Sequence, residues 1–348
     1  MEKIMKACNL YSVGDLRYED HPIPVPGTDE VLLQIKAAGI CGSDIPRIFE
    51  KGTYHFPTIP GHEFAGEIVD AAQEDKNLLG KKVTVFPLLP CGKCAACQTG
   101  DYSQCADYDY YGSRRDGAFA EYIAVKKWNL VPVPDAVSFE CAALCEPCAV
   151  AIHALSQAGI SLGDTVVIFG AGPIGLMAAQ IAKSWGADII ILADIDEAKL
   201  NFARELGFSY TVNSGVNDTT DFVRSIAGQK GADVVLEAAG VSAALEDSLK
   251  AAKTFGKVVL MGNPAGKMEL SQKAYWEILR KQLTVKGTWN SSYNDSVNDW
   301  RMAIRCMERG IIQSEKLITH KFPLADYQKA FELARRKNEF SVKIMFTF

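Results

Sequence analysis

The 348-residue sequence predicts an α/β protein in which a β-rich part precedes a part built on a doubly wound parallel sheet. Up to about residue 155, short strand-like runs such as EVLLQIKAAGI and KVTVFPL are broken by Gly and Pro. From Thr165 to about Asn290, apolar strand-like runs alternate with segments of helical periodicity. This alternation is typical of βαβ units, and the length of the chain allows two hydrophobic cores.

Six apolar runs in the second part are predicted to form one parallel sheet, because strands covered by helices on both faces are apolar throughout. They read TVVIF, ADIIILAD, SYTVN, ADVVLEAA, KVVLMG and QLTVKGTW, with helical segments such as GPIGLMAAQIAKSWG between them. The helical runs DWRMAIRCMERG and DYQKAFELARR follow the sheet and are expected to rejoin the first domain. We therefore expect a first domain over residues 1–155, a second over 156–290, and a C-terminal segment, 291–348, that returns to the first.

The glycine-rich turn GAGPIG lies between the first predicted strand of this sheet and its helix. Its glycines allow a tight turn, close approach of a pyrophosphate and packing of helix on strand, and the helix N-terminus favours the anion. An acidic residue roughly 20 residues further on accepts hydrogen bonds from the adenosine ribose. Asp194 occupies that place, with Asp196 as the competing acid, and its charge would repel the 2′-phosphate of NADP. We therefore expect NAD, bound by Asp194 and by the residues of the turn, Gly170, Gly172, Pro173, Ile174 and Gly175.

Four of the ten cysteines fall within the short segment CGKCAACQTGDYSQC. In a reducing cytosol, clustered cysteines are expected to bind metal rather than to form disulfides. Four thiolates suit tetrahedral zinc with no open position, so such a site holds a loop in shape and cannot bind a substrate. The predicted ligands of this structural zinc are Cys91, Cys94, Cys97 and Cys105.

Chemistry is then expected elsewhere, and four further residues supply ligands of mixed kind. Cys41 lies in GICGSDIPRIF, His62 and Glu63 lie in GHEFAGEI, and Glu146 lies in LCEPCAV. Each of them alone is compatible with a purely structural role. Together they supply a thiolate, an imidazole and carboxylates, which suits a zinc ion with a replaceable ligand.

In this order, these motifs resemble the zinc-dependent medium-chain alcohol and polyol dehydrogenases. GICGSD, GHEFAGEI, the four-cysteine segment, DGAFAEY and GAGPIG carry the resemblance along essentially the whole chain. It implies a GroES-like catalytic domain, a Rossmann domain that binds NAD, and two zinc ions per chain. It also implies that Cys41, His62 and Glu146 bind the catalytic zinc, while Glu63 is a further ligand or exchanges with water.

The implied reaction is oxidation of a substrate hydroxyl with hydride transfer to NAD. The hydroxyl is expected to bind zinc and to lose its proton through Ser43, whose side chain can donate and accept hydrogen bonds. Asp44 is expected to support the site without reacting. Many members of the family carry a histidine soon after CGSD, whereas this chain has Pro46 and Arg47. The proton path beyond Ser43 is therefore left open.

Two adjacent arginines in YYGSRRDGAFAEY bear on the substrate. Neutral polyols need no arginine, whereas guanidinium groups match the geometry of phosphate. Arg114, Arg115 and Arg47 are therefore candidate phosphate ligands. The alternative for Arg114 and Arg115 is that they are solvated surface charge or form salt bridges with Asp116 or Glu121. The segments SDIPRIF, PLLPC and YGSRRDG resemble those of the polyol-phosphate dehydrogenases within this family, and the resemblance implies oxidation of galactitol 1-phosphate to tagatose 6-phosphate. The alternatives are sorbitol or L-iditol, then L-threonine, and, from a different class, a catalytically inactive nucleotide-binding relative.

Charge and hydropathy argue against other classes of partner. The net charge is -5, the pI is about 5.7 and no long basic run is present, so no nucleic acid is expected. No stretch approaches ~18 uninterrupted apolar residues, and the N-terminal residues lack the pattern of a signal peptide. We expect a cytoplasmic enzyme that has no membrane partner. The family resemblance implies a homodimer or homotetramer.

Overall fold

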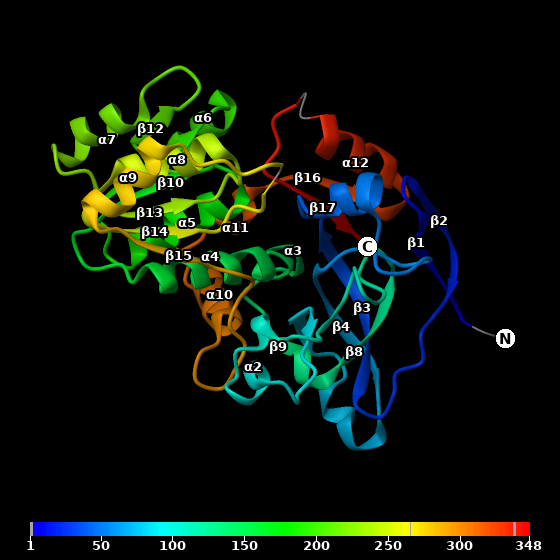
Figure 1. Cartoon of the computed structure of the whole chain (residues 1–348). Coiled ribbons are helices and arrows are strands. Elements are labelled where there is room, and N and C mark those ends of the chain that lie inside the picture. Colours follow the sequence, from blue (N-terminus) through cyan, green and yellow to red (C-terminus); the bar gives the residue numbers. More distant parts are fainter. Residues whose placement is uncertain (1–2, 265, 337–338) are drawn as a thin grey trace. The chain divides into compact units, whose positions relative to one another are not determined.

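The computed structural model describes residues 3–264, 266–336 and 339–348. The chain divides into two compact units (Figure 1). Unit 1 consists of Met1–Pro147 and Ser292–Phe348, and unit 2 consists of Cys148–Ser291. Within the described ranges, none of the helices combines the length and the apolar character needed to cross a lipid bilayer.

Unit 1 is built on a seven-stranded sheet in the order β16-β17-β3-β4-β5-β9, with β8 also paired to β3. The strands of this sheet are β3 (Glu30–Gly39), β4 (Glu63–Ala71), β5 (Lys82–Val85), β8 (Tyr122–Lys126), β9 (Leu130–Pro132), β16 (Ile318–Pro323) and β17 (Lys343–Thr347). Two further antiparallel pairs are β1 (Ile4–Ser12) with β2 (Asp15–Pro22) and β6 (Leu88–Leu89) with β7 (Asp109–Tyr110). The β-rich character predicted for the first part of the chain is confirmed.

Short helices connect the strands of unit 1, and longer ones follow after unit 2. The α-helices are α1 (Asp44–Pro46), α2 (Ala95–Gln98), α3 (Phe139–Ala143), α10 (Asp299–Glu308), α11 (Ser314–Leu317) and α12 (Tyr327–Arg336). A π-helical turn, η1 (Arg47–Lys51), follows α1 directly, and the 3₁₀ turns are η2 (Gln73–Leu78), η3 (Tyr102–Gln104), η4 (Lys127–Asn129) and η5 (Leu324–Asp326).

Aromatic side chains join the two segments of unit 1 in one core. The rings of Phe119, Phe331 and Phe346 pack pairwise with centroids 5.2 to 5.9 Å apart. β17 pairs antiparallel with the end of β3. A segment that follows unit 2 in the chain therefore lies beside a segment from the N-terminal part of the chain. Burial of this apolar surface is the main force that holds the returning segment in place.

Unit 2 contains a six-stranded parallel sheet in the order β12-β11-β10-β13-β14-β15, which confirms the predicted doubly wound fold. Its strands are β10 (Thr165–Phe169), β11 (Ile189–Asp194), β12 (Tyr210–Asn213), β13 (Ala232–Glu237), β14 (Ala252–Leu260) and β15 (Thr284–Gly287). The helices are α5 (Pro173–Ser184), α6 (Glu197–Glu205), α7 (Thr219–Ala227), α8 (Ser242–Ala251) and α9 (Gln272–Lys281). The chain enters this unit through α4 (Cys145–Ala158).

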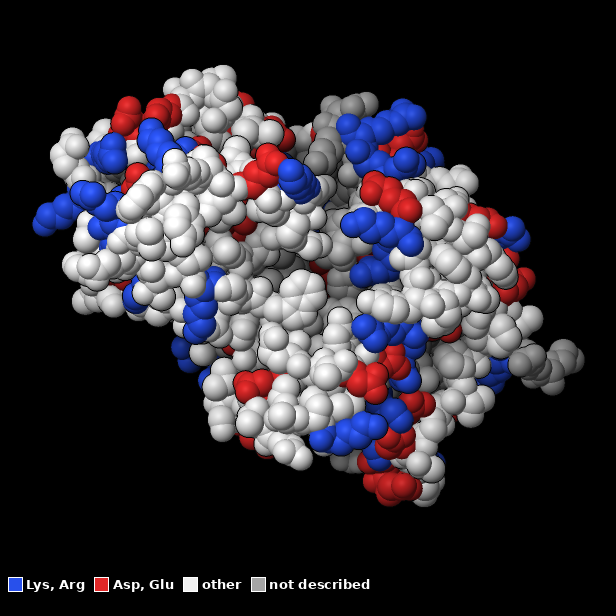
Figure 2. All heavy atoms as spheres, in the orientation of Figure 1, with Lys and Arg blue, Asp and Glu red and all other residues white. Residues whose placement is uncertain are grey.

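Charged residues are mixed on the molecular surface. On the face shown in Figure 2, Lys and Arg side chains alternate with Asp and Glu side chains, and no broad area of one sign covers that face. Acidic residues number 42 and basic residues 37 in the sequence. The face shown in Figure 2 therefore carries no extended basic patch of the kind that binds a polyanion.

Candidate active site

Three potential metal ligands meet in unit 1 where strand β3 ends and the neighbouring strand β4 begins. β3 ends at Gly39, β4 begins at Glu63, and these two residues pair across the antiparallel ladder. Cys41 follows β3 and His62 precedes β4, so the register brings the three side chains together. Glycine is required at position 39, because a Cβ atom there would overlap the carboxylate of Glu63.

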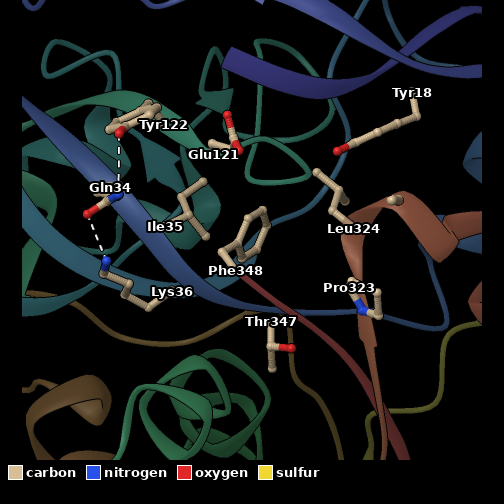
Figure 3. Close-up of a pocket in the computed structure, with 11 residues that line it drawn as sticks. Tyr18, Gln34, Ile35, Lys36, Glu121, Tyr122, Pro323, Leu324, Thr347 and Phe348 are labelled. Atoms are coloured by element: carbon tan, nitrogen blue, oxygen red, sulfur yellow. Dashed lines mark hydrogen bonds between the residues drawn. The ribbon is translucent and has the colours of Figure 1, made fainter.

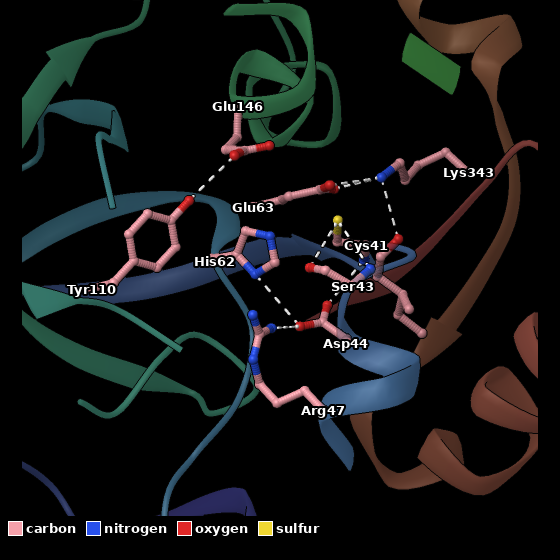
Figure 4. A network of polar contacts seen from close by, with 10 residues as sticks. Cys41, Ser43, Asp44, Arg47, His62, Glu63, Tyr110, Glu146 and Lys343 are labelled. Carbon is pink, nitrogen blue, oxygen red and sulfur yellow. Dashed lines mark hydrogen bonds and ion pairs between the residues drawn. The ribbon is translucent and has the colours of Figure 1, made fainter. Parts of the chain in front are cut away.

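The ligand atoms of Cys41, His62 and Glu63 lie within 4.8 Å of one another, and we call these residues the metal trio (Figure 4). His62 and Glu63 are buried, and Cys41 is half-buried. A thiolate, an imidazole and a carboxylate are donors that zinc accepts, and three protein ligands leave a position for water or substrate.

The electrostatics of the metal trio also suit a cation. Burial opposes protonation of His62, but Asp44 and Cys41 outweigh it and raise the pKa of His62 well above its usual range. A site that stabilises positive charge on the imidazole so strongly also favours a divalent cation bound by that imidazole. The donors and the charge of the site therefore fit zinc.

Asp44 contacts the edge of the His62 ring that points away from Cys41 and Glu63. Its buried carboxylate lies 3.4 Å from His62 Nδ1, while the other ring nitrogen faces Cys41 and Glu63 (Figure 4). Arg47 Nη1 donates to the same carboxylate oxygen at 2.7 Å, and the backbone N–H of Cys41 donates to the other at 3.0 Å. Burial alone would raise the pKa of Asp44, but His62 and Arg47 reverse the effect and lower it. A carboxylate in this position orients a metal-binding imidazole.

Lys343, on β17, reaches the metal trio from the returning segment of unit 1. Its Nζ donates to both carboxylate oxygens of Glu63 at 2.6 and 2.9 Å and to the backbone carbonyl of Ile40 at 3.2 Å. Burial works against the charge on Lys343, but Glu63 and Cys41 raise the pKa of its amino group. The pair fixes the direction in which the Glu63 carboxylate points.

Glu146, which was expected to bind the catalytic zinc, is not among the ligands that lie within 4.8 Å of one another. It lies on α4, and Tyr110 Oη donates to its Oε1 at 3.3 Å (Figure 4). Burial raises the pKa of Glu146 to about 7, and His62 acts in the opposite direction. The structure thus places Glu63, rather than Glu146, beside Cys41 and His62, and the role of Glu146 stays a prediction.

Ser43, the predicted proton carrier, lies beside the metal trio. Its hydroxyl donates to the sulfur of Cys41 at 3.3 Å, and its backbone N–H lies 3.5 Å from the same sulfur. These contacts stabilise the thiolate form of Cys41, because a donor satisfies its charge. The hydroxyl can rotate to serve a bound substrate, so both roles are chemically open to this side chain.

The segment DGAFAEY supports the loop that carries His62. The backbone N–H of Gly117 donates to the carbonyl of Ile59 at 2.6 Å, and the carboxylate of Asp116 accepts from the N–H of Ile59 at 2.9 Å. A Cβ atom at Gly117 would overlap the carbonyl of Gly61. The two backbone segments therefore approach as closely as glycine allows, which fixes the position of His62.

The four clustered cysteines converge around α2. The sulfurs of Cys94 and Cys97 lie 3.5 Å apart, and the Cys91–Cys97 and Cys94–Cys105 pairs are each 3.9 Å apart. Sulfurs at about 2.3 Å from a tetrahedral zinc would be separated by roughly 3.8 Å. None of the four forms a disulfide. Backbone N–H groups lower the pKa of Cys94 to about 6, which favours a thiolate ligand. The geometry fits a closed zinc site.

The glycine-rich turn of unit 2 lies at the N-terminus of α5. Gly170 has a φ of +105°, and a Cβ atom at Gly175 would overlap the carbonyl of Gly170. Gly172 has no atom within 4 Å of the place of a Cβ, and it begins α5 without a side-chain cap. Free backbone N–H groups beside open space form a site that fits a pyrophosphate.

Asp194 ends β11 next to this turn. Its carboxylate accepts hydrogen bonds from the N–H of Ala171 at 2.7 Å and from the N–H of Asp196 at 2.9 Å. The carboxylate of Asp196 instead accepts from the N–H of Ala198 and caps α6. Of the two competing acids, Asp194 is therefore the one in contact with the glycine-rich turn.

The three arginines proposed for phosphate binding have different surroundings. Arg47 is paired with Asp44 at 2.7 Å, and Arg115 Nε donates to Asp109 at 2.6 Å. Arg114 instead stacks on two tyrosine rings. Asp116 and Glu121, the acids considered for Arg114 and Arg115, do not supply these contacts of either arginine.

A separate cavity of about 300 Å³ lies in unit 1, between β3 and the end of β17 (Figure 3). Some of its polar groups are already paired, since Gln34 donates to the hydroxyl of Tyr122 and Lys36 donates to Gln34. None of the predicted site residues lines it. The cavity therefore offers no reactive group for the chemistry of the metal trio.

Two functional candidates were not found from the sequence, Lys343 and Tyr110. Lys343 stands alone as a charged residue in the apolar run SVKIMFTF, and a lone charge in a strand of this kind is a signal that a buried partner is required. Tyr110 gave no such signal, because a tyrosine next to a second tyrosine in the sequence is equally compatible with a residue of the hydrophobic core.

Comparisons with known proteins agree with this geometry. Residues 27–135 match the model of the alcohol dehydrogenase GroES-like domain, and residues 173–309 match that of the zinc-binding dehydrogenases. The chain is 37% identical to galactitol 1-phosphate 5-dehydrogenase of Escherichia coli K12 over 321 residues, which cover 91% of this chain and 92% of that protein. It is 33% identical to sorbitol dehydrogenase of Bacillus subtilis, with 98% and 96% covered. A zinc-binding dehydrogenase of Sinorhizobium meliloti, solved with bound NADP, superposes with a TM-score of 0.92 at 31% identity, and both chains are covered completely.

Proposed function

The chain belongs to the zinc-dependent medium-chain dehydrogenases and is therefore an oxidoreductase, and from this premise we propose that it oxidises a secondary hydroxyl of a polyol phosphate with NAD. The observation that carries the proposal is the metal trio, in which His62 and Glu63 are buried and Cys41 is half-buried. An intact set of ligands also argues against a catalytically inactive relative that only binds nucleotide.

The metal ligands and their neighbours prepare the reaction. Zinc, when bound, supplies a Lewis acid that lowers the pKa of a coordinated hydroxyl. Asp44 holds the imidazole of His62 in orientation, and Lys343 directs the carboxylate of Glu63. Ser43 Oγ lies beside Cys41, and we propose that it takes the proton of the substrate hydroxyl. The second predicted ligand carboxylate, that of Glu146, would take part only after a rearrangement of its side chain.

NAD is the proposed hydride acceptor. The free N–H groups at the start of α5 would bind its pyrophosphate, and Asp194 would accept hydrogen bonds from its ribose hydroxyls. A carboxylate in contact with the turn disfavours the 2′-phosphate of NADP, because two negative charges would meet there.

The proposed substrate is galactitol 1-phosphate and the product tagatose 6-phosphate. Support comes from the identity of 37% to galactitol 1-phosphate 5-dehydrogenase and from an arginine in unit 1 that has no acidic partner among the described residues. The second candidate is an unphosphorylated polyol, which the 33% identity to sorbitol dehydrogenase over nearly the whole chain favours.

One comparison of substrates tests the proposal. kcat/KM is measured for galactitol 1-phosphate, galactitol, sorbitol, L-iditol and L-threonine, each with NAD and with NADP, on zinc-loaded protein. We expect the phosphate ester with NAD to be preferred at least ~10-fold, which a charge-assisted hydrogen bond to phosphate is sufficient to supply. A free polyol that matches the ester would replace the proposed substrate with the second candidate, and no activity on any of them would refute the reaction class.

The homodimer or homotetramer that the family resemblance implies stays a prediction. β15 is an edge strand of the sheet in unit 2, and Val285 and Trp289 at this edge are 37% and 55% exposed. Exposed apolar side chains beside an edge strand are compatible with an interface between subunits. Sedimentation equilibrium measures the number of subunits directly.

A further inference from the structure

We propose that Arg114, which lies over the rings of Tyr54 and Tyr108, is the group that binds the phosphate of the substrate. The inference rests on the proposed function, because it names the part of unit 1 that would recognise a polyol phosphate. It selects one arginine from the three that the sequence offered.

The guanidinium of Arg114 lies over two tyrosine rings. Its central carbon lies 4.2 Å from the ring centroid of Tyr54 and 4.4 Å from that of Tyr108. Stacking on two aromatic faces fixes the plane of a guanidinium and leaves its N–H edge for hydrogen bonds. We call this arrangement the tyrosine clamp. A flexible arginine is thereby prepared for a planar, bidentate contact, which lowers the entropy lost on binding.

The hydrogen-bond donors of Arg114 are not fully used. Its Nε is buried and has no hydrogen-bond partner among the described residues. Its Nη2 donates only a long bond, 3.4 Å, to the hydroxyl of Tyr54. A buried donor without a partner is unfavourable by itself, so an acceptor that reached this side chain would be bound favourably.

The neighbouring cations are already neutralised. Arg47 is paired with Asp44, and Arg115 is paired with Asp109. Arg114 has no such partner: among the residues that the structure describes, no carboxylate oxygen lies within 4.0 Å of its guanidinium nitrogens. An arginine that keeps its positive charge uncompensated beside a cavity is suited to an external anion.

A cavity of about 480 Å³ opens beside the tyrosine clamp, and both of its rings line it. This volume falls within the range of small-molecule sites. Two carboxylates, Asp107 and Asp109, also face the cavity. Asp109 is neutralised by Arg115, and Asp107 is exposed, so water and salt screen its repulsion of a phosphate.

The tyrosine clamp is connected to the metal trio by ring contacts. Tyr108 packs edge-on against Tyr110 with centroids 6.2 Å apart, and Tyr110 lies 5.8 Å from the ring of His62. Tyr108 and Tyr110 thus link the surroundings of Arg114 to the ring of His62, and we propose that a substrate bound at the metal trio directs its phosphate to this side. A neutral polyol has no group that requires the guanidinium, whereas a phosphate does.

The test compares Arg114→Gln with the double variant Arg115→Gln/Asp109→Asn, which removes the adjacent arginine together with the carboxylate that it pairs with. For each zinc-loaded variant, kcat/KM is measured with galactitol 1-phosphate and with galactitol, and inhibition by inorganic phosphate is titrated against galactitol. Circular dichroism and zinc content check that each variant is folded. We expect Arg114→Gln to lower the ratio of ester to free polyol roughly 10- to 100-fold and to abolish inhibition by phosphate. The double variant should change that ratio by less than about threefold, since the two charges that it removes already compensate each other.

A third variant, Tyr54→Leu, removes one face of the tyrosine clamp and keeps the charge. It should lower the same ratio less than Arg114→Gln does, because the guanidinium remains but is no longer held in place. If the wild-type protein prefers the ester and Arg114→Gln keeps the preference, the clamp is refuted and the proposed substrate stands. If the wild-type protein shows no preference for the ester, the proposed substrate fails, and the inference fails with it.

Discussion

Replacing Lys343 with methionine tests the buried ion pair beside the metal trio. The side chains of Lys343 and Glu63 are only 4% and 1% exposed, and Nζ contacts both carboxylate oxygens at 2.6 and 2.9 Å. Methionine keeps much of the apolar length of lysine but carries no charge. The carboxylate of Glu63 would then stay buried without its cation. Removing one partner of a buried pair typically lowers the free energy of unfolding by about 3–5 kcal/mol.

Two further variants separate this effect from a general loss of lysine. Lys329→Met removes a cation from α12 whose pair with Asp326 is exposed, with side chains 70% and 38% exposed. Exposed pairs contribute about 0–1 kcal/mol, so this control should remain close to wild type. The double variant Lys343→Met/Glu63→Gln leaves no unpaired charge, and it should recover at least half of the lost free energy.

Urea unfolding gives the free energy, and hydrogen exchange of the amides in β3 and β4 reports on unit 1 separately from unit 2. The measurements are made on zinc-loaded protein and again after chelation, because a cation in the metal trio would itself compensate Glu63. We expect the larger loss after chelation. The reasoning would be refuted if the free energy of unfolding of Lys343→Met stayed within about 1 kcal/mol of wild type under both conditions. It would also be refuted if the double variant were no more stable than Lys343→Met.

Other variants test the two metal sites, the cofactor and the support of the active-site loop. Cys41→Ser should abolish activity and reduce the zinc content from two ions to one without unfolding. Cys97→Ser should lose the other ion and lower the melting temperature. Elemental analysis, calorimetry and an activity assay check both, and the opposite assignment of the two effects would show that the sites are exchanged. Asp194→Asn keeps a hydrogen-bond acceptor for the glycine-rich turn but removes its charge, so the preference for NAD in kcat/KM should narrow by roughly tenfold, and an unchanged ratio would contradict the proposed role. Gly117→Ala inserts a Cβ atom against the backbone of Gly61 and should destabilise the protein by about 1–3 kcal/mol with loss of zinc at the metal trio, while wild-type stability would show that the two segments can separate freely.

Features that lie close together in the sequence were predictable, and those made by distant segments were not. The four clustered cysteines and the turn at Gly170 are local patterns whose chemistry follows from spacing. The six strands of unit 2 follow from their apolar runs, because both faces of a parallel sheet are covered. The pair of Lys343 with Glu63 joins positions 280 residues apart, and no local pattern encodes it. Likewise, spacing alone could not show that Glu63 rather than Glu146 stands beside Cys41 and His62.

The return of the chain to unit 1 affects the order in which the protein can fold during synthesis. β17 emerges from the ribosome only after all of unit 2, so until then the end of β3, Ala37–Gly39, has one edge unpaired and Glu63 has no cation. Unit 2 has no such dependence, since its six strands are consecutive in the chain. The incomplete unit 1 would expose a strand edge and apolar surface while its neighbour is already folded. Slow translation through residues 148–291 should therefore increase the demand for chaperones in the cell.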